Sequence, residues 1–591
     1  MYFAFLILST LPLSESVPES QAVVLPASVV SQAEKFANPP GTAIVVQPGD
    51  EDSKKHDIKN AIRIDVKNQP QNPWSVGFQI PTDKAVDKDE VLLFRFKTRH
   101  VGEQTETGGA VLRVLFEKGS SPYSKSLSKD VEVEKNWTEF SFPLKSVDSY
   151  KTGEAKVGFQ LGFQIQSLEI ADLTLESYGK DCDIRSLPQS GMTYAGRESH
   201  AAWRKEAEKR IDAHRKGAVA IHVCDAAGNP VENVVIELKM LRHAFPWGTA
   251  VTTRRLLQQD EDGNRYRAIV ERYFNRVSFE NDMKWHRWDN DKNRDDTFKA
   301  IEWLRARNID IRGHCLLWPS WRNSPAEYRS MADEPERLRQ AVNNRLEKTV
   351  LSLRGIVVAW DVLNEPFDNN DLMQVLGDEE TVEWFKRVRR LDANAKLYVN
   401  DYSILSEKGL HKEHQDHLEK TIRFLQARGA PLSGIGLQSH FVEAVTPPER
   451  IKKILDRFAA PGLPMTITEH DIDTEDEQLQ ADYTRDFLTM AFSHPSVEAI
   501  SCWGFWEKSH WRPKGAYFRS DWSLKPAGQA WIDQTTKRWW THERGVSDQQ
   551  GNFETRGFLG DYEIRVRIDD NEQVIRASIP KQGTDITIML P

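Results

Sequence analysis

From about residue 243 onwards, short apolar runs alternate with longer charged segments that have helical spacing. The runs are rich in β-branched residues and end abruptly at polar positions, as strands buried on both faces of a parallel sheet do. We expect such strands at 243–251, 276–280, 309–318, 356–360, 397–401, 434–440, 465–469 and 500–505. Eight strands separated by helices predict an α/β fold, a closed (β/α)8 barrel of the TIM-barrel type, over residues 243–540.

The chain before the barrel has a different pattern. Between residues 21 and 184, apolar and polar positions alternate in short runs, for example at 61–66, 91–98 and 110–117. Gly, Pro, Asn and Asp turns separate these runs, and the intervals are too short for a crossover helix. This pattern predicts an all-β sandwich of the jelly-roll type over residues 21–184.

Two shorter segments flank the barrel. Residues 199–242 predict a linking helix at 199–215, followed by two strands around a turn at 228–230. We expect this small β unit to pack against the barrel entrance. Residues 541–591 alternate again between apolar and polar positions and predict a small C-terminal β extension.

Composition narrows the range of functions. The formal net charge of the 591 residues is -9, and no long basic block occurs, which argues against nucleic acid as a partner. The chain has 18 Trp residues; most are expected in the core, but a flat indole face also suits a sugar ring. The four cysteines are widely spaced and form no metal-ligand pattern. We expect Cys315 and Cys502 as small buried residues inside barrel strands.

A short apolar run at residues 2–13 is followed by a small-x-small motif at 14–16. The run is shorter than the roughly 20 residues that span a bilayer, and it is typical of a secretory signal. Residues 1–16 are therefore predicted to be a signal peptide, and the protein is expected to be secreted or periplasmic, with no membrane partner.

Two of the predicted strands end at a glutamate. The run at 356–360 breaks into polar residues, and Pro366 cannot continue the ladder, so Glu365 is expected at the carboxyl end of that strand. The run at 465–469 likewise ends at Glu469. The carboxyl ends of the strands form the catalytic face of such barrels, and two carboxyl groups there suit glycoside hydrolysis. The alternative is that each glutamate is a solvated loop residue.

The motifs WDVLNEP (residues 360–366) and TITEHDI (residues 466–472) resemble glycoside hydrolase family 10, whose best-known members are endo-1,4-β-xylanases. The resemblance covers residues 244–540 and recurs at other strand ends. It implies that Glu365 is the general acid/base and Glu469 the nucleophile. A retaining pair of this kind is expected to hold its carboxyl groups about 5–5.5 Å apart.

The resemblance also implies roles for neighbouring residues. His440 would donate a hydrogen bond to Glu469, Asp471 would orient that histidine, and Asn364 would bind the sugar hydroxyl next to the reacting carbon. Family positions that hold the sugars are matched by Glu280, Asn281, Lys284, His314 and Gln438, and the aromatic cleft walls by Trp318, Trp503 and Trp511. Alternatively, Lys284 forms a plain surface ion pair. His440, in turn, could have a structural role instead of one in the site.

Three departures from the family pattern leave the side groups and the length of the substrate open. After Trp318 the family usually continues with His-Ser-Gln, whereas this chain has Pro-Ser-Trp at residues 319–321. His470 stands where leucine is usual, and Trp-Glu at residues 506–507 begins an atypical loop after the eighth strand. None of these departures involves the two glutamates.

The layout of residues 21–184 resembles carbohydrate-binding modules of families 4 and 9. Trp74, Phe78 and Tyr123 are expected in or beside loops, where they would form a sugar platform; ordinary packing of the sandwich is the alternative.

Together, the residues and the resemblance predict a secreted, retaining endo-1,4-β-xylanase that hydrolyses internal β-1,4 bonds of xylan by double displacement. No cofactor and no metal are expected, because two carboxyl groups and water suffice, and the protein is expected to be a monomer. Two alternatives stay open. One is a related endo-β-1,4-glucanase, and the other is a non-catalytic polysaccharide-binding protein.

Overall fold

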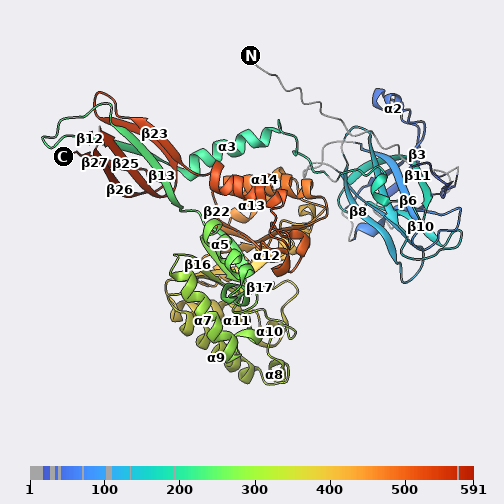
Figure 1. The fold of residues 1–591 in the computed structure, drawn as a ribbon. Coiled ribbons are helices and arrows are strands. Elements are labelled where there is room, and N and C mark those ends of the chain that lie inside the picture. The colour runs from blue at the N-terminus through green and yellow to red at the C-terminus, as the bar shows by residue number, and fades with distance from the viewer. Residues whose placement is uncertain are drawn as a thin grey trace, which may run out of the picture. The chain divides into compact units, whose positions relative to one another are not determined.

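This computed structural model describes residues 18–26, 29, 33–37, 41–68, 72–101, 110–133, 135–191, 193–568 and 571–590. The chain divides into two units, residues 1–193 and 194–591. Figure 1 shows the elements of each unit. The predicted signal peptide at residues 1–16 lies outside the described residues.

The first unit is a sandwich of two antiparallel sheets. Its strands are β1 (Ala22–Val23), β2 (Glu34–Ala37), β3 (Gly41–Val46), β4 (Ala61–Val66), β5 (Val76–Pro81), β6 (Val91–His100), β7 (Ala110–Lys118), β8 (Lys125–Val133), β9 (Thr138–Lys145), β10 (Ala155–Gln160) and β11 (Gln166–Gly179), with the short helix α2 (Glu51–Lys55). One sheet has the order β3-β4-β11-β6-β9, with β1 beside β11, and the other has the order β2-β5-β10-β7-β8. Stacked rings, such as Phe78 and Phe159 at 4.7 Å, fill the space between the sheets. The all-β fold expected for this region is confirmed.

The second unit contains a closed barrel of parallel strands. They are β14 (Trp247–Val251), β15 (Arg276–Phe279), β16 (Asp310–Gly313), β17 (Val357–Asn364), β18 (Lys396–Asp401), β19 (Gly434–Leu437), β21 (Met465–Asp473) and β22 (Val497–Cys502), with β20 (His440–Val442) beside β21. Each strand pairs with the next barrel strand along the chain, and β19 pairs with β21. The barrel closes where β22 pairs with β14. The (β/α)8 barrel expected from the apolar runs is confirmed.

Some predicted strand bounds were wrong. The first barrel strand begins at Trp247, because the residues up to His243 belong to a strand that pairs outside the barrel. The third strand ends at Gly313, so Cys315 lies after the strand, although it is buried as expected. The predicted sixth strand, residues 434–440, is interrupted between β19 and β20.

Helices cover the outside of the barrel (Figure 1). They are α4 (Thr253–Leu257), α5 (Glu261–Tyr273), α6 (Trp285–Trp288), α7 (Asp291–Arg305), α8 (Ala326–Arg329), α9 (Pro335–Leu353), α10 (Asp371–Leu376), α11 (Glu379–Leu391), α12 (Lys412–Ala427), α13 (Pro448–Ala459), α14 (Glu477–Ser493) and α15 (Pro526–Asp533). In α11, Val382, Phe385 and Val388 form one buried stripe, as an amphipathic surface helix requires. Between β17 and β18 the helical segment is divided in two, because Gly377, with a φ of 85°, ends α10 before α11 begins.

A second β structure in this unit joins segments from both sides of the barrel. Its strands are β12 (Lys216–Cys224), β13 (Val235–His243), β23 (His542–Val546), β24 (Asn552–Phe558), β25 (Gly560–Ile568), β26 (Asn571–Ile579) and β27 (Thr584–Met589), which we call the β module. They form sheets of order β24-β12-β27 and β23-β13-β25-β26. The two flanking segments, expected as separate pieces, therefore pair with each other. The expected linking helix is α3 (Ala202–Arg215).

The last residue of α3, directly before the β module, contacts the amino end of β22 and the end of α14. Arg215 donates hydrogen bonds of 2.7 Å to the carbonyl oxygens of Phe492, His494 and Val497, just where β22 begins. The expectation that this unit packs at the barrel entrance was wrong, because β13 leads through three residues into the amino end of β14, away from the catalytic face.

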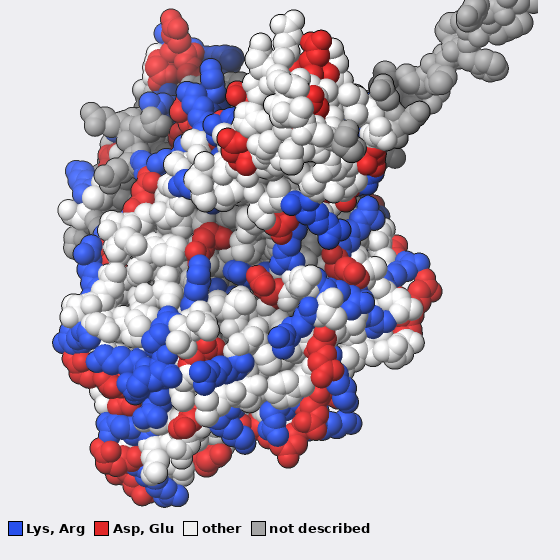
Figure 2. All heavy atoms as spheres, turned by 90° about the vertical axis from the view of Figure 1, so that its left-hand side faces the viewer, with Lys and Arg blue, Asp and Glu red and all other residues white. Residues whose placement is uncertain are grey.

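Acidic and basic side chains intermix over the face drawn in Figure 2. This agrees with the modest net charge of -9 on a chain that has 79 basic and 88 acidic residues.

Candidate active site

A cleft of about 680 Å³ lies at the carboxyl ends of the barrel strands. Eleven of the thirteen predicted site residues line it: Glu280, Asn281, Lys284, His314, Trp318, Glu365, Gln438, His440, Glu469, Trp503 and Trp511. The other two, Asn364 and Asp471, are buried behind this lining. The structure thus brings residues from most of the barrel strands to one site.

Glu365 follows the last residue of β17 and is half-buried in the cleft. Its φ of 53° lies in the left-handed region, which non-glycine residues seldom adopt. The Glu365 N–H donates to the carbonyl oxygen of Asn400 at 2.8 Å. Its carboxyl oxygens accept hydrogen bonds from Gln438 at 2.9 Å and Trp318 at 3.0 Å. Neighbouring strand ends therefore fix both the backbone and the side chain.

Glu469 lies within β21 and is almost fully buried. One carboxyl oxygen accepts a hydrogen bond of 2.9 Å from Asn400, and the other is 3.2 Å from Nε2 of His440. The Nδ1 atom of His440 is 3.0 Å from Asp471, whose second oxygen accepts a 2.6 Å hydrogen bond from Trp511. A chain of contacts thus runs from the Trp511 indole to the Glu469 carboxylate.

The two glutamates have opposite tendencies to ionise. Burial raises the pKa of Glu365, and the nearby charges of Glu469 and Asp401 raise it further, although the hydrogen bond from Gln438 opposes them. Burial would also raise the pKa of Glu469, but the hydrogen bond from His440 and other donors hold that pKa below its usual range. One carboxyl group is thus favoured as an acid and the other as an anion.

His440 is the main donor to Glu469. Burial lowers the pKa of an imidazole, but here the charge of Asp471 and the contacts with both carboxylates raise the pKa of His440 to about 9. A protonated His440 carries a positive charge at neutral pH, so it favours the anionic form of Glu469.

The predicted sugar-binding residues at the ends of β15 and β16 contact each other and the nearby indole. Lys284 donates a 3.1 Å hydrogen bond to Asn281, and its ammonium group lies 4.9 Å from the centre of the Trp318 ring. Within the described part of the chain Lys284 has no ion pair, so the surface ion pair considered for it is not formed. His314 contacts Asp361 at 2.9 Å through Nδ1, which orients its ring.

Three tryptophans line the cleft as expected. Trp318 donates to Glu365, the Trp503 ring lies 5.1 Å from the His314 ring, and the Trp511 ring lies 4.6 Å from the His440 ring. Trp511 is 46% exposed, so an apolar ring face is open to a ligand.

The Pro-Ser-Trp segment at residues 319–321, which departs from the family pattern, is hydrogen-bonded to the loop that follows Glu365. The Trp321 N–H donates a 2.7 Å hydrogen bond to Asp371, and the Leu372 N–H donates a 3.0 Å bond to the carbonyl of Pro319. The departure from the family pattern therefore joins the loops after β16 and β17.

The other two departures from the family pattern, His470 and the pair Trp506–Glu507, contact neighbouring side chains outside the cleft lining. His470 is buried and stacks on Phe487 of α14, with the ring centres 4.5 Å apart, so it faces away from the cleft. Trp506 is buried and stacks on Trp522 at 4.1 Å, and Glu507 forms a 2.9 Å ion pair with Lys525.

Several residues of the site were not foreseen from the sequence. Asn400 donates from one amide group to both Asn364 and Glu469, each at 2.9 Å. The cleft is also lined by Arg322, Asp368, Asn369, Tyr402, Ser403, Ser406, Glu407, Val442 and Arg512. The available signal was the polar run Asn-Asp-Tyr-Ser at residues 400–403, which begins within the fifth predicted strand and interrupts the apolar pattern at its carboxyl end.

The aromatic residues considered in the sandwich do not form one platform. Phe78 is fully buried in the core, whereas Trp74 and Tyr123 are exposed. Trp74 precedes β5 and Tyr123 follows β7, and both strands run antiparallel to β10 between them. The two exposed rings therefore lie at opposite ends of this sheet.

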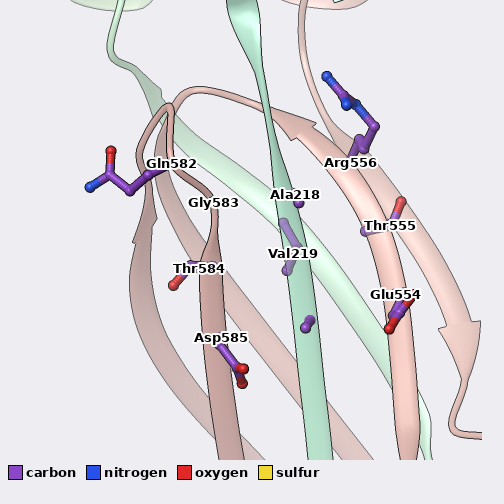
Figure 3. A pocket seen from close by; sticks show the side chains of 10 residues that line it. Ala218, Val219, Glu554, Thr555, Arg556, Gln582, Gly583, Thr584 and Asp585 are labelled. Atoms are coloured by element: carbon purple, nitrogen blue, oxygen red, sulfur yellow. The ribbon is translucent and has the colours of Figure 1, made fainter.

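A second cavity, of about 770 Å³, lies over the three-stranded sheet of the β module. Figure 3 shows Val219 and Ala218 on the central strand, with Glu554 and Arg556 on one side and Asp585 on the other. No aromatic ring lines this cavity. Nor does its lining hold two carboxyl groups like Glu365 and Glu469, of which one is favoured as an acid and the other as an anion. The cleft of the barrel is thus the better candidate for chemistry.

Among the residues that the structure describes, no His, Cys, Asp and Glu side chains converge in a group of three or more that could hold a metal ion. Within the same residues, no helix is both long and apolar enough to cross a membrane.

Comparison with known proteins relates residues 238–534 to the model of glycosyl hydrolase family 10. Anti-sigma-I factor RsgI6 of Acetivibrio thermocellus is 36% identical over 64% of this chain and 49% of its own length. Endo-1,4-beta-xylanase 1 of Arabidopsis thaliana is 29% identical over 63% of this chain and 38% of its own length. The chain thus spans half or less of the length of these two relatives.

Among solved structures, xylanase 10B from Thermotoga petrophila RKU-1, in complex with xylobiose, is similar. It is 26% identical and covers 50% of this chain and 94% of its own, with a TM-score of 0.45. Because the family model matches half of the chain, the protein belongs to glycosyl hydrolase family 10.

Proposed function

We propose that the protein is a retaining endo-1,4-β-xylanase that hydrolyses internal β-1,4 bonds of xylan. The observation that carries this proposal is the pair Glu365 and Glu469, which line one cleft and have opposite tendencies to ionise. Family membership supports the reaction class, and the printed names of several relatives include endo-1,4-beta-xylanase.

In the first step, the carboxylate of Glu469 attacks the anomeric carbon while Glu365 transfers its proton to the leaving oxygen. The bond between that carbon and the leaving oxygen breaks, and a covalent sugar–Glu469 ester remains. In the second step, Glu365 takes a proton from water, whose oxygen attacks the same carbon and releases Glu469. Two inversions at one carbon give net retention of the anomeric configuration.

Neighbouring groups have supporting roles in this proposal. His440, held by Asp471, donates to Glu469 and keeps it anionic. Asn364 is held by Asn400 and binds the hydroxyl next to the reacting carbon. The sugars on the side away from the leaving group are bound by Glu280, Asn281, Lys284, His314 and Gln438. The three cleft tryptophans are walls on which sugar rings stack.

The first test measures stereochemistry and turnover. Proton NMR of a xylan digest should show the β-anomer of the new reducing end first, because the mechanism retains configuration. Glu469→Ala should lose nearly all turnover. Glu365→Ala should lose about 10²–10⁴-fold on xylan, and much less on an aryl xyloside whose leaving group needs no proton.

The control is Glu507→Gln, which removes a carboxylate that lies after β22 and outside the cleft lining; its turnover should match that of the unchanged protein. Initial appearance of the α-anomer, or equal losses of Glu365→Ala on both substrates, would contradict the assignment.

Two rival functions are separated by substrate and by turnover. A glucanase would release more reducing ends from carboxymethylcellulose than from xylan, because its site admits a hydroxymethyl group. A non-catalytic binding function has some support, since a 36% identical relative is named an anti-sigma factor. It would be favoured if the protein bound insoluble xylan and released no product.

We also propose export, with residues 1–16 as the signal peptide, because a polymer such as xylan is met outside the cell. The protein is proposed to act as a monomer. Gel filtration with light scattering, and N-terminal sequencing of the exported protein, test these two points.

A further inference from the structure

A buried amide lies directly against Glu365. Asn369, in the turn after β17, is 4% exposed and forms part of the cleft lining. Its Nδ2 atom donates to the backbone carbonyl oxygen of Glu365 at 3.2 Å and to the carboxyl atom Oε2 at 3.4 Å. The Asn369 N–H donates to the same carbonyl oxygen at 3.1 Å. Asn369 therefore contacts both the backbone and the carboxyl group of Glu365.

The orientation of this amide is fixed from another loop. Asn323, in the loop after β16, donates a 3.0 Å hydrogen bond from its Nδ2 atom to the Oδ1 atom of Asn369. Because the oxygen of Asn369 accepts there, its NH₂ group is the one that faces Glu365. The Asn323 N–H donates to the carbonyl oxygen of Ser320 at 3.1 Å, so the segment that departs from the family pattern holds Asn323 in place.

The donors are divided unequally between the two carboxyl oxygens of Glu365. Oε2 accepts from Trp318 at 3.0 Å and from Asn369 at 3.4 Å. Within the described part of the chain, Oε1 accepts from Gln438 alone, at 2.9 Å. A carboxyl oxygen has two lone pairs. Both lone pairs of Oε2 are thus occupied, whereas one on Oε1 stays open.

This division suits only one position for the proton of the carboxyl group. With the proton on Oε1, Oε2 is the carbonyl oxygen and accepts two hydrogen bonds. Oε1 then accepts one, and its O–H is free to donate to a ligand. With the proton on Oε2, one of the two N–H donors would lose its acceptor, which is costly in a buried site.

We infer that Oε1 of Glu365 carries the proton for the reaction, and that Asn369, oriented by Asn323, is the positioning residue that keeps it there by occupying Oε2. This inference rests on the proposed role of Glu365. In the first step the proton passes from Oε1 to the leaving oxygen, which takes the electron pair of the breaking bond to the anomeric carbon. In the second step Oε1 takes a proton from the attacking water. Asn369 acts through Glu365 in both steps.

The first test compares kcat/KM on xylo-oligosaccharides with kcat/KM on an aryl xyloside whose leaving group needs no proton. Asn369→Ala should lower the first value about 2–10-fold, the range for one hydrogen bond, and leave the second within about twofold. Asn323→Ala should show the same pattern with a smaller loss, because Asn369 keeps its place but not its orientation. The double variant should lose no more than Asn369→Ala alone, since both residues act through one contact.

Asn370→Ala is the matched control, because it makes the same change at the next residue of the same turn. The Asn370 amide donates to the carbonyl oxygen of Phe367 at 3.1 Å and not to Glu365. The ratio of its two kcat/KM values should equal that of the unchanged protein. Equal losses on both substrates in Asn369→Ala would indicate a merely structural residue and overturn the inference. Losses that add in the double variant would overturn it as well.

An infrared readout needs no turnover and separates this inference from the proposed function. The C=O stretching band of protonated Glu365, assigned by its loss in Glu365→Gln, lies at lower wavenumber when its carbonyl oxygen accepts more hydrogen bonds. Asn369→Ala removes one bond from Oε2 and should move the band to higher wavenumber, whereas Asn370→Ala should not. A band that stays in place in Asn369→Ala would refute the inference even in an active xylanase. If the unchanged protein hydrolyses no xylan, the proposed function fails, and the band still decides which oxygen holds the proton.

Discussion

Glu365 and Glu469 have identical side chains, and their neighbours make one a candidate acid and the other a candidate anion. Both glutamates could be found from the sequence, because each follows an apolar run that ends abruptly. Their partner Asn400 could not be assigned a role in this way. Its amide contacts come from β18 and reach Asn364 and Glu469 on other strands, and no local pattern encodes that convergence.

At this scale we predict a pH dependence of stability from His440. The pKa of His440 is raised to about 9 in the fold, above the value near 6.5 of an unfolded chain. Its protonation therefore stabilises the fold fully below about pH 6.5, and this contribution is lost as pH rises towards 9. In His440→Gln, the decline of unfolding free energy over this window should be smaller by up to about 3 kcal/mol.

Urea unfolding followed by tryptophan fluorescence, at steps between pH 6.5 and 9.5, measures this difference. His542→Gln is the matched control, because it makes the same chemical change on an exposed histidine of the β module. Parallel curves for His440→Gln and the unchanged protein would contradict the prediction.

At the scale of elements, the apolar runs located every barrel strand, but the ends of several strands were misplaced. The runs at 243–251 and 309–318 continue in apolar residues beyond the strand, since residues around Cys315 are buried without belonging to the ladder. An apolar pattern reports burial, and burial extends into the packed loops at both ends of a barrel strand. The division between α10 and α11 leaves no apolar signal, because residues on both sides of Gly377 suit helices and only the positive φ of the glycine separates them.

The attachment of α3 to α14 gives a prediction at this scale. Asp486 of α14 is fully buried and accepts hydrogen bonds from Tyr194 at 2.7 Å and from both terminal nitrogens of Arg204, at 2.5 and 2.6 Å. Asp486→Asn removes the charge that compensates Arg204. It should lower the free energy of unfolding by about 2–4 kcal/mol, near the range for a broken buried pair.

Glu206→Gln is the matched control on the same helix, because Glu206 is exposed and binds only Lys209, one turn away, among the described residues. Thermal unfolding of both variants measures the effect. Equal melting temperatures for the two would mean that Asp486 does not anchor α3.

At the scale of the whole molecule, the sequence predicted a β sandwich, a barrel and two small β segments, and it did not predict that the small segments form one structure. β12 pairs with β24 and β27, and β13 pairs with β23 and β25, across the whole length of the barrel sequence. Alternation along a strand shows which face is buried but not which distant strand lies beside it.

This arrangement predicts opposite outcomes for two truncations. A chain that ends at residue 540 leaves β12 and β13 without their partners and should aggregate or melt at a lower temperature, since unpaired strand edges associate. A chain of residues 194–591 keeps every pairing of the second unit and should retain its melting transition and its hydrolysis of xylo-oligosaccharides.

Soluble yield, calorimetry and turnover of the two truncated chains test this contrast. An unaltered melting temperature for the chain ending at 540 would show that the β module contributes nothing to the second unit.

The pairing across the barrel also has a consequence for biosynthesis. β13 leaves the ribosome about 300 residues ahead of β23, which corresponds to some 15–60 s at ordinary translation rates of about 5–20 residues/s. The barrel itself is translated during that interval, so β12 and β13 stay without their partner strands until residues 542–589 have been made. Slowing elongation within the last fifty codons should therefore increase the demand for chaperones, whereas slowing it within the first hundred should not.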